Sequence, residues 1–359
     1  MRDALIRRTL ELCRIASVTG DEAACASHIE ALLRETPLEI SRIGLTVLAR
    51  TPSVPGRPLV LLVGHSDTVP PKAADRGVRI EGDRLYGLGA SDMKGGLAVM
   101  VELARAIGDG RGLSMDLGFV FYDKEEGPWA DSGLGPVLDQ AAWLRSADLA
   151  FCLEPSDNVV QVGCLGTLHA TATFVGKAAH SARPWQGINA IHAAAPLLAA
   201  LAARVPNDVN CDGHTFREVL TATLASGGST RNVIPDQFSV NLNFRFAPGR
   251  SDESAMKEVI GFCAASCPDL PPVVTFSEVA PSGRVVLNNP LLRRFLAENN
   301  SAVCAKQAWT DVARLSREGI DAVNLGPGHA AQAHQADEYC GIDLLEASYG
   351  QFARFVGCP

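Results

Sequence analysis

The first half of the chain alternates short apolar runs with amphipathic segments. Residues 59–63, 117–122 and 149–153 carry no charge, which is typical of central strands buried on both faces of a parallel sheet. Between the first two runs, apolar residues recur at helical spacing from Asp92 to Ile107, so a helix is expected there. Buried strands alternating with helices predict an α/β fold with a mostly parallel sheet, in which ligands gather beyond the carboxyl ends of the strands.

From about residue 167 the pattern changes to strict alternation. Residues 167–175 and 238–246 alternate apolar and polar side chains, as strands with one solvated face do. The other elements predicted in this part are helices over 189–203 and 251–265 and a strand over 273–279. This order predicts a β-α-β-β-α-β, ferredoxin-like α+β domain.

The domain boundaries follow from the point where the first pattern returns. A helix is expected around 289–299, and buried-strand character reappears at 322–325. A chain of 359 residues is also longer than one core usually grows. We therefore expect a discontinuous catalytic, metal-binding domain, residues 1–166 and 282–359, into which residues 167–281 are inserted as the ferredoxin-like domain.

Composition and net charge indicate which classes of molecule the protein could bind. Hydrophobic residues make up 47% and charged residues 20% of the chain, which is enough apolar material for a buried core. A formal net charge of −8 gives no positive field for phosphate backbones or anionic lipids, so we expect a small-molecule partner, no nucleic acid and no membrane. No long uncharged run suited to a signal peptide opens the chain, so a cytoplasmic protein is expected. The ten cysteines are scattered and are expected to be reduced thiols.

Five polar clusters contain the candidate chemistry, and three directly follow apolar runs. His65 and Asp67 follow the first run; residues two apart in extended chain point the same way, so Asp67 can orient the His65 ring while its other nitrogen binds a metal. Glu125 and Glu126 follow the second run. Adjacent carboxylates repel unless they are solvated or share a cation or a proton. With a metal present, one of them ligates and its neighbour serves as general base.

The other clusters contain Asp92, Glu154 and His334. Asp92 stands at the expected helix start, where a carboxylate could bridge two cations, whereas Glu154 follows the third apolar run and His334 lies near the C-terminus. Together the five clusters supply His, Asp, Glu, Glu and His. This set of nitrogen and oxygen ligands suits zinc or a similar divalent ion.

Each cluster alone also has a plainer interpretation. A histidine after a strand is more often a satisfied polar residue, Asp92 would be a good helix N-cap, and Glu125 with Glu126 is compatible with an acidic surface turn. Gly87 and Gly89 suggest a dinucleotide-binding loop. Asp92 stands where that loop needs a third glycine, so we reject this interpretation.

Taken in order, the clusters resemble the co-catalytic zinc peptidase and deacylase family, which includes aminoacylases, glutamate-releasing carboxypeptidases, acetylornithine deacetylase and succinyl-diaminopimelate desuccinylase. The motifs that carry the resemblance are Gly-His-Ser-Asp-Thr-Val-Pro (64–70), Ser-Asp-Met-Lys-Gly-Gly (91–96), Glu-Glu-Gly (125–127), Glu-Pro-Ser (154–156) and His334. They span nearly the whole chain, and five motifs in order are far more specific than any one of them.

The resemblance implies two divalent metal ions, zinc by preference and cobalt as the alternative. By analogy Asp92 bridges the two ions, His65 and Glu154 complete one site, and Glu126 and His334 complete the other.

The resemblance also implies three roles in catalysis. Glu125 would be the general base and Asp67 would support the metal site from behind His65. His180 is similar to a family histidine that the inserted domain of a partner subunit extends towards the oxyanion, which implies a homodimer through this lid and dimerisation domain. A surface-loop histidine is the plainer alternative for His180.

Further strings are most similar to the desuccinylase branch, which removes a succinyl group from a small amino-acid substrate in diaminopimelate and lysine biosynthesis. These strings cover residues 176–187, 231–236, 243–249 and 322–328. Arg245 lies on the polar face of its predicted strand, where it can grip a carboxylate with two hydrogen bonds, although a solvated strand face is equally compatible. The expected substrate-binding residues are Arg245, Asn232, Asn243, Thr310, Gly326 and Gly328.

One departure from the branch leaves alternatives open. Residues 121–124 read Phe-Tyr-Asp-Lys, where many desuccinylases have a Thr-Ala-Asp type of sequence beside the base. An acetylornithine deacetylase, or a general N-acyl amino-acid hydrolase or carboxypeptidase, would use the same chemistry. A catalytically inactive, metal-binding relative is the non-enzymatic alternative.

Overall fold

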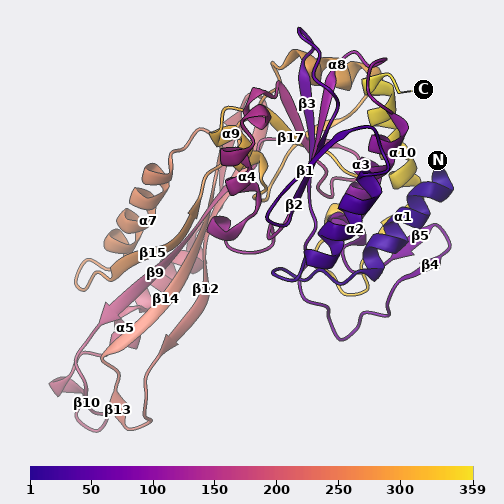
Figure 1. Cartoon of the computed structure of the whole chain (residues 1–359). Coiled ribbons are helices and arrows are strands. Elements are labelled where there is room, and N and C mark those ends of the chain that lie inside the picture. The colour runs from indigo at the N-terminus through magenta and orange to yellow at the C-terminus, as the bar shows by residue number, and fades with distance from the viewer. Residues whose placement is uncertain (359) are drawn as a thin grey trace. The chain divides into compact units, whose positions relative to one another are not determined.

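The computed structural model describes residues 1–358 and divides into two compact units (Figure 1). Unit 1 consists of Met1–Gly163, Arg284–Ala305 and the chain from Arg314 onward, and unit 2 consists of Cys164–Gly283 and Lys306–Ala313. The segment Lys306–Ala313 is expected in the catalytic domain from the sequence-based boundaries, but in the structure it belongs to unit 2. It belongs to unit 2 because it hydrogen-bonds there: the Gln307 amide accepts from the Arg217 N–H at 3.1 Å and donates to the Thr215 carbonyl at 2.7 Å.

The core of unit 1 is an eight-stranded sheet. In spatial order its strands are β1 (Glu39–Ile43), β2 (Thr46–Arg50), β6 (Asp116–Tyr122), β3 (Leu59–His65), β7 (Leu149–Cys152), β17 (Ala322–Asn324), β8 (Val160–Val162) and β16 (Val303–Ala305). The central strands β6, β3, β7 and β17 run parallel, and the antiparallel pairs lie towards the edges. The predicted α/β fold with a mostly parallel sheet is confirmed, and the three uncharged runs are its central strands.

Helices pack on this sheet through large apolar side chains. The helices of unit 1 are α1 (Arg2–Arg14), α2 (Ala23–Leu33), α3 (Gly95–Ala106), α4 (Leu134–Gln140), α8 (Pro290–Asn299) and α10 (Ile342–Val356), and α9 (Val312–Arg317) begins in the segment assigned to unit 2. Phe151 of β7 contacts the rings of Phe295 in α8 and of Phe352 and Phe355 in α10, with centroids 4.9–5.9 Å apart. The chain's C-terminal helix therefore completes the core that its first strands begin.

A second, three-stranded sheet joins distant parts of unit 1. It consists of β4 (Arg79–Glu81), β5 (Arg84–Tyr86) and β18 (Tyr339–Gly341), with β18 paired antiparallel to β5. This pairing fixes the segment that precedes β18, which contains His334, beside the segment that leads from β5 to α3.

Unit 2 has a five-stranded antiparallel sheet covered by helices. Its strands in spatial order are β11 (Asn207–Cys211), β12 (His214–Gly227), β14 (Gln237–Phe246), β9 (Gly166–Val175) and β15 (Val273–Ala280), and its helices are α5 (Ala190–Ala193), α6 (Ala195–Ala203) and α7 (Asp252–Ser266). The elements follow the predicted β-α-β-β-α-β order, with β11 added at the edge next to β12. The alternating apolar residues of β9 and β14 form its core with α7.

The helix expected over 189–203 is two helices. Asn189 caps α5 by accepting hydrogen bonds from the N–H groups of Ile191 and His192. The chain then breaks at Ala194, and α6 starts with Pro196 in its first turn. Proline has no N–H to donate to the preceding turn, so the helical hydrogen-bond pattern is interrupted there.

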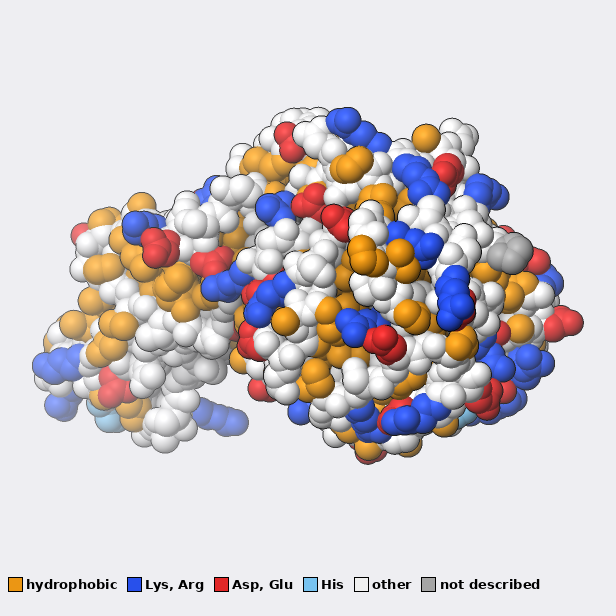
Figure 2. All heavy atoms as spheres, turned by 45° about the horizontal axis from the view of Figure 1, so that its top comes forward, with side chains coloured by type: hydrophobic (Ala, Val, Ile, Leu, Met, Phe, Trp, Pro, Cys, Tyr) orange, Lys and Arg blue, Asp and Glu red, His pale blue; other side chains and the backbone are white. Residues whose placement is uncertain are grey.

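Among the described residues, none of the helices combines the length and apolar character that crossing a bilayer requires. On the face drawn in Figure 2, acidic and basic side chains are interspersed rather than gathered by sign.

Candidate metal centre and active site

The carboxyl ends of three adjacent parallel strands bring three of the five polar clusters to one edge of the sheet. His65 is the last residue of β3, Glu125 and Glu126 follow β6, and Glu154 follows β7. Because β3 pairs in parallel with both β6 and β7, these side chains share the edge at which ligands bind in open α/β sheets.

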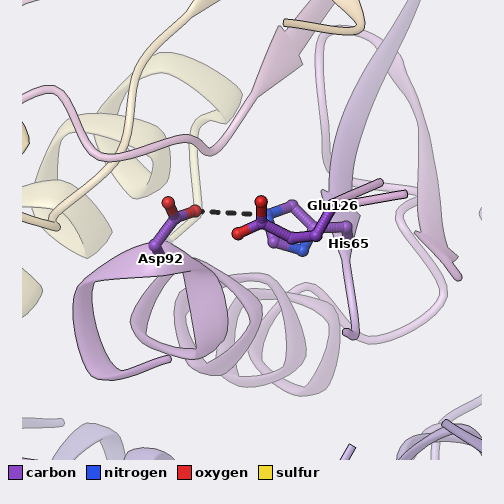
Figure 3. A group of neighbouring side chains, drawn as sticks. All are labelled: His65, Asp92 and Glu126. Carbon is purple, nitrogen blue, oxygen red and sulfur yellow. Dashed lines mark hydrogen bonds and ion pairs between the residues drawn. The ribbon is translucent and has the colours of Figure 1, made fainter. Parts of the chain in front are cut away.

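Asp92 stands between two histidines. His65, only 1% exposed, places Nε2 3.2 Å from Asp92 Oδ1 and 4.0 Å from Glu154 Oε1. His334 places Nε2 2.9 Å from Glu126 Oε1 and 3.7 Å from Asp92 Oδ2. Figure 3 shows the His65 ring, Asp92 and Glu126 facing one another. The structure therefore brings all five predicted ligands together, with one Asp92 oxygen towards each histidine.

The carboxylates perturb both histidines. Burial alone would lower the pKa of His65, but hydrogen bonds to Asp67 and Asp92 outweigh it and hold the pKa well above its ordinary value. The hydrogen bond to Glu126 raises the pKa of His334 in the same way. In both cases the neighbouring carboxylates favour the protonated form of the imidazole.

These residues fit a divalent cation. Ligand atoms of His65, Asp92 and Glu126 all lie within 4.8 Å of one another, and Glu154 is also buried. Carboxylates concentrated in this way repel one another unless a cation compensates them. Imidazole nitrogens and carboxylate oxygens are ligands that zinc accepts in catalytic sites.

Asp67 fixes two ligand segments at once. It is fully buried, and the His65 Nδ1 atom lies 3.1 Å from its backbone carbonyl and 3.4 Å from its Oδ1, as expected of a residue that orients this ring. Its carboxylate also accepts hydrogen bonds from the backbone N–H groups of Glu125 and Glu126, both at 3.0 Å, and from Thr19 Oγ1 at 2.9 Å. Sequence reasoning missed this second role, because nothing local links residue 67 to the acidic pair.

Asp92 lies beside a helix start, as predicted, but it is not the helix N-cap that the plainer interpretation of its cluster suggested. It has extended backbone angles (φ −118°, ψ 90°), and α3 begins only at Gly95. The backbone N–H groups of Gly89, Ser91 and Asp92 donate instead to the carboxylate of Glu338, at 2.7–2.9 Å. Burial raises the pKa of Glu338 to about 7. Sequence reasoning assigned this residue no role, and its position four residues after His334 was the only available signal.

Gly326 and Gly328 pack against the backbone that carries the ligands. A Cβ atom on Gly326 would lie 2.3 Å from the Leu153 carbonyl oxygen and 2.5 Å from that of Glu154, and one on Gly328 would lie 2.2 Å from the Ser91 carbonyl oxygen. Only glycine allows so close an approach. The structure gives both residues a packing contact, and substrate binding by them stays a prediction.

His180 and Asn232 lie next to each other in unit 2. His180 belongs to β10 (Ala179–His180), which pairs with β13 (Val233–Ile234), and Ser181 donates its N–H to the Asn232 carbonyl at 2.9 Å. The His180 side chain is exposed, and its Nδ1 accepts the Ala182 N–H at 3.0 Å.

Arg245 lines a cavity of about 480 Å³ within unit 2, together with Arg217 and Gln307. Its Nε donates to Asn243 Oδ1 at 3.1 Å, so Asn243 orients the guanidinium. Burial lowers the pKa of Arg245, which remains charged at neutral pH because the ordinary pKa of arginine is so high. Thr310 is 3% exposed, so its predicted contact with substrate would need its side chain to become accessible.

Comparison with known proteins agrees with this geometry. The profile of peptidase family M20/M25/M40 matches residues 61–357. A protein of Mycobacterium tuberculosis (strain ATCC 25618 / H37Rv), which bears the provisional name succinyl-diaminopimelate desuccinylase, is 38% identical over 359 residues and covers 99% of each chain. The succinyl-diaminopimelate desuccinylase of Corynebacterium glutamicum is 36% identical over 345 residues, 94% of this chain and 92% of the relative.

A solved structure shares the fold at lower sequence identity. A tripeptidase from Staphylococcus aureus subsp. aureus Mu50 superposes with a TM-score of 0.81 at 21% identity and covers 99% of this chain and 98% of its own. Because the family profile spans most of the sequence and both relatives align over nearly all of it, the chain belongs to peptidase family M20/M25/M40.

Proposed function

We propose that the chain is a metal-dependent amidohydrolase that converts N-succinyl-LL-2,6-diaminopimelate and water to succinate and LL-diaminopimelate, in diaminopimelate and lysine biosynthesis in the cytoplasm. The observation that carries the proposal is the convergence of two histidines and three carboxylates at one sheet edge, His65, Asp92, Glu126, Glu154 and His334. Relatives at 38% and 36% identity that are named for this reaction support the choice of substrate.

The five side chains would hold two divalent ions, zinc by preference and cobalt as the alternative. Asp92 would contribute to holding both ions, since its two oxygens face different histidines. His65 and Glu154 would hold one ion with it, and His334 and Glu126 would hold the other. When bound, such ions supply Lewis acidity, which polarises an amide carbonyl and makes water more acidic.

Glu125 acts as the general base. It takes a proton from the water that attacks the succinyl amide carbon and delivers that proton to the leaving amine, so that the enzyme ends the cycle unchanged. Asp67 holds the backbone N–H groups of Glu125 and Glu126 through its two oxygens. The backbone of Glu125 and Glu126 therefore stays in place while Glu126 contacts His334 and Glu125 transfers the proton.

His180 donates a hydrogen bond to the developing oxyanion, from the inserted domain of the other subunit of a homodimer. Its Nδ1 accepts the Ala182 N–H, so the neutral ring carries its proton on Nε2, which is the donor that the role requires. Exposed apolar side chains of unit 2, such as Ile191, Leu198 and Leu224, supply surface for dimerisation. Analytical ultracentrifugation tests the dimer: a monomer at micromolar concentration removes this role for His180.

The substrate's carboxylates are bound by Arg245, which Asn243 orients, with further contacts from Asn232, Thr310 and the turn that contains Gly326 and Gly328. A planar guanidinium binds a carboxylate through two parallel hydrogen bonds. Arg245 lines a cavity large enough for a small ligand, which supports this role.

The deciding experiment is an activity panel with added Zn²⁺. We expect kcat/KM for N-succinyl-LL-diaminopimelate to exceed that for N-acetylornithine and for other N-acyl amino acids. A preference for N-acetylornithine would make the chain an acetylornithine deacetylase. A protein that takes up metal but turns over none of these substrates would be the inactive metal-binding relative.

A further inference from the structure

The turn that carries Asp92, residues Ala90–Lys94, is a kinked and irregular helical turn that precedes α3. Gly89 has a left-handed backbone (φ 79°), and Asp92 and Met93 have non-helical angles before α3 begins at Gly95. Those N–H groups of a buried, irregular turn that lack a local acceptor must find one elsewhere, because an unpaired buried donor is destabilising. The position of the Asp92 side chain therefore depends on whatever supplies these acceptors.

Glu338 supplies them. Its Oε2 accepts the Gly89 N–H at 2.9 Å, and its Oε1 accepts the N–H groups of Ser91 at 2.7 Å and Asp92 at 2.8 Å. The Glu338 backbone carbonyl also accepts the Gly87 N–H at 3.0 Å. The residue is 3% exposed, so water cannot readily replace these bonds.

The same segment holds the other metal site. His334 lies four residues before Glu338 and approaches Asp92 Oδ2 at 3.7 Å. Ser91 adds a parallel connection, because its Oγ donates to the Tyr339 carbonyl at 2.7 Å and accepts the His329 N–H at 3.0 Å. The contacts between the Asp92 turn and the segment 334–339 thus set the distance between the Asp92 carboxylate and His334.

We infer that Glu338 is a positioning residue for the metal pair: through three backbone N–H groups it places the Asp92 carboxylate between His65 and His334. It acts through Asp92 and makes no direct contact with substrate in this role. The inference rests on the proposed function only for its activity readout, because its effect on metal binding is measured without substrate.

Glu338→Ala and Glu338→Gln test the inference. Alanine removes all three acceptors, whereas glutamine keeps an oxygen for some of the N–H groups and turns an amide N–H₂ towards the rest. We expect the affinity of the metal-free protein for Zn²⁺, measured by competition with a chromophoric chelator, to fall about 10- to 100-fold in the alanine variant. A smaller loss is expected for glutamine. With the desuccinylase substrate at saturating Zn²⁺, kcat should fall while KM changes little.

Asp116→Asn is the matched control, because Asp116 is a buried carboxylate that accepts a single backbone N–H, from Val54 at 2.9 Å, at the opposite end of β6. It should lower the unfolding temperature without changing Zn²⁺ affinity.

Zn²⁺ affinity within about twofold of wild type in a folded Glu338→Ala protein would overturn the inference. If the alanine variant does not fold, unchanged Zn²⁺ affinity in Glu338→Gln would overturn it equally. Absence of desuccinylase activity in the wild type would refute the proposed function and leave the metal titration to decide on Glu338.

Discussion

The candidate metal centre of unit 1 and the proposed substrate-contacting residues of unit 2 are built in different ways. In unit 1, His65, Asp67 and Asp92 are at most 9% exposed, and each has hydrogen-bond contacts with groups at least 27 positions away in the sequence. In unit 2 the proposed residues differ among themselves: His180 and Asn232 are exposed and lie on or beside strands of two residues, whereas Asn243 and Thr310 are buried. Buried polar groups need every bond, whereas exposed ones on short strands open at little cost. We infer that the candidate reaction centre in unit 1 is preorganised and that His180 and Asn232 in unit 2 are more adaptable. Substitutions made separately in the two units should distinguish these properties.

Removal of metal should have the largest effect. If the carboxylates of unit 1 hold catalytic cations, dialysis against a chelator removes several kcal/mol of transition-state stabilisation, about 10⁴-fold in kcat. Added Zn²⁺ should restore activity and raise the unfolding temperature. Full activity after verified removal of metal, measured by elemental analysis, would contradict the proposed centre.

Glu125→Ala should lower kcat by about 10²- to 10⁴-fold, since that is the usual contribution of a general base. Bound metal should stay at the wild-type level, because Glu126 and not Glu125 faces His334. Elemental analysis and steady-state kinetics give both values. Glu39→Ala is a control on an exposed edge strand and should leave both unchanged. Loss of metal together with activity would show that Glu125 ligates.

His180→Ala should lower kcat by about 10²- to 10³-fold, the usual cost of losing one oxyanion donor, with metal content unchanged. This outcome would show that a residue of unit 2 acts on the reaction without contributing to the metal site. His214→Ala, at the start of β12 in the same unit, is the matched control and should keep wild-type kinetics. An unchanged kcat in the His180 variant would limit catalysis to unit 1.

Arg245→Lys should have the smallest effect, a rise in KM of about tenfold with kcat nearly unchanged. Lysine keeps the charge but loses the two-pronged hydrogen-bonding geometry, which is worth about 1.5 kcal/mol. Arg217→Lys serves as control, because Arg217 lines the same cavity but is already paired with Asp208 through two hydrogen bonds of 2.7 and 2.9 Å. A change in kcat rather than KM would contradict a role in ground-state binding.

The sequence predicted the central strands and the convergence of those proposed metal ligands that follow them, because both depend on local patterns. An uncharged run such as residues 59–63 is compatible with few environments other than a buried strand. Neighbouring parallel strands then bring His65, Glu126 and Glu154 to the same sheet edge. The ferredoxin-like order followed from alternation in the same way, although β12 was not located and the helix break before Pro196 was missed.

Only the tertiary structure decided how the ligands are held. The spacing of apolar residues from Asp92 onward predicts a helix. In the structure the Asp92 N–H donates instead to the carboxylate of Glu338, 246 residues later in the chain. The Asp67 carboxylate likewise binds the N–H groups of residues 58 and 59 positions later in the chain. The sequence by itself determined which side chains carry charge and which segments must be buried, because these are properties of single residues and short runs. Long-range hydrogen bonds between buried groups determined where the charges stand, and such bonds leave no periodic trace in the sequence.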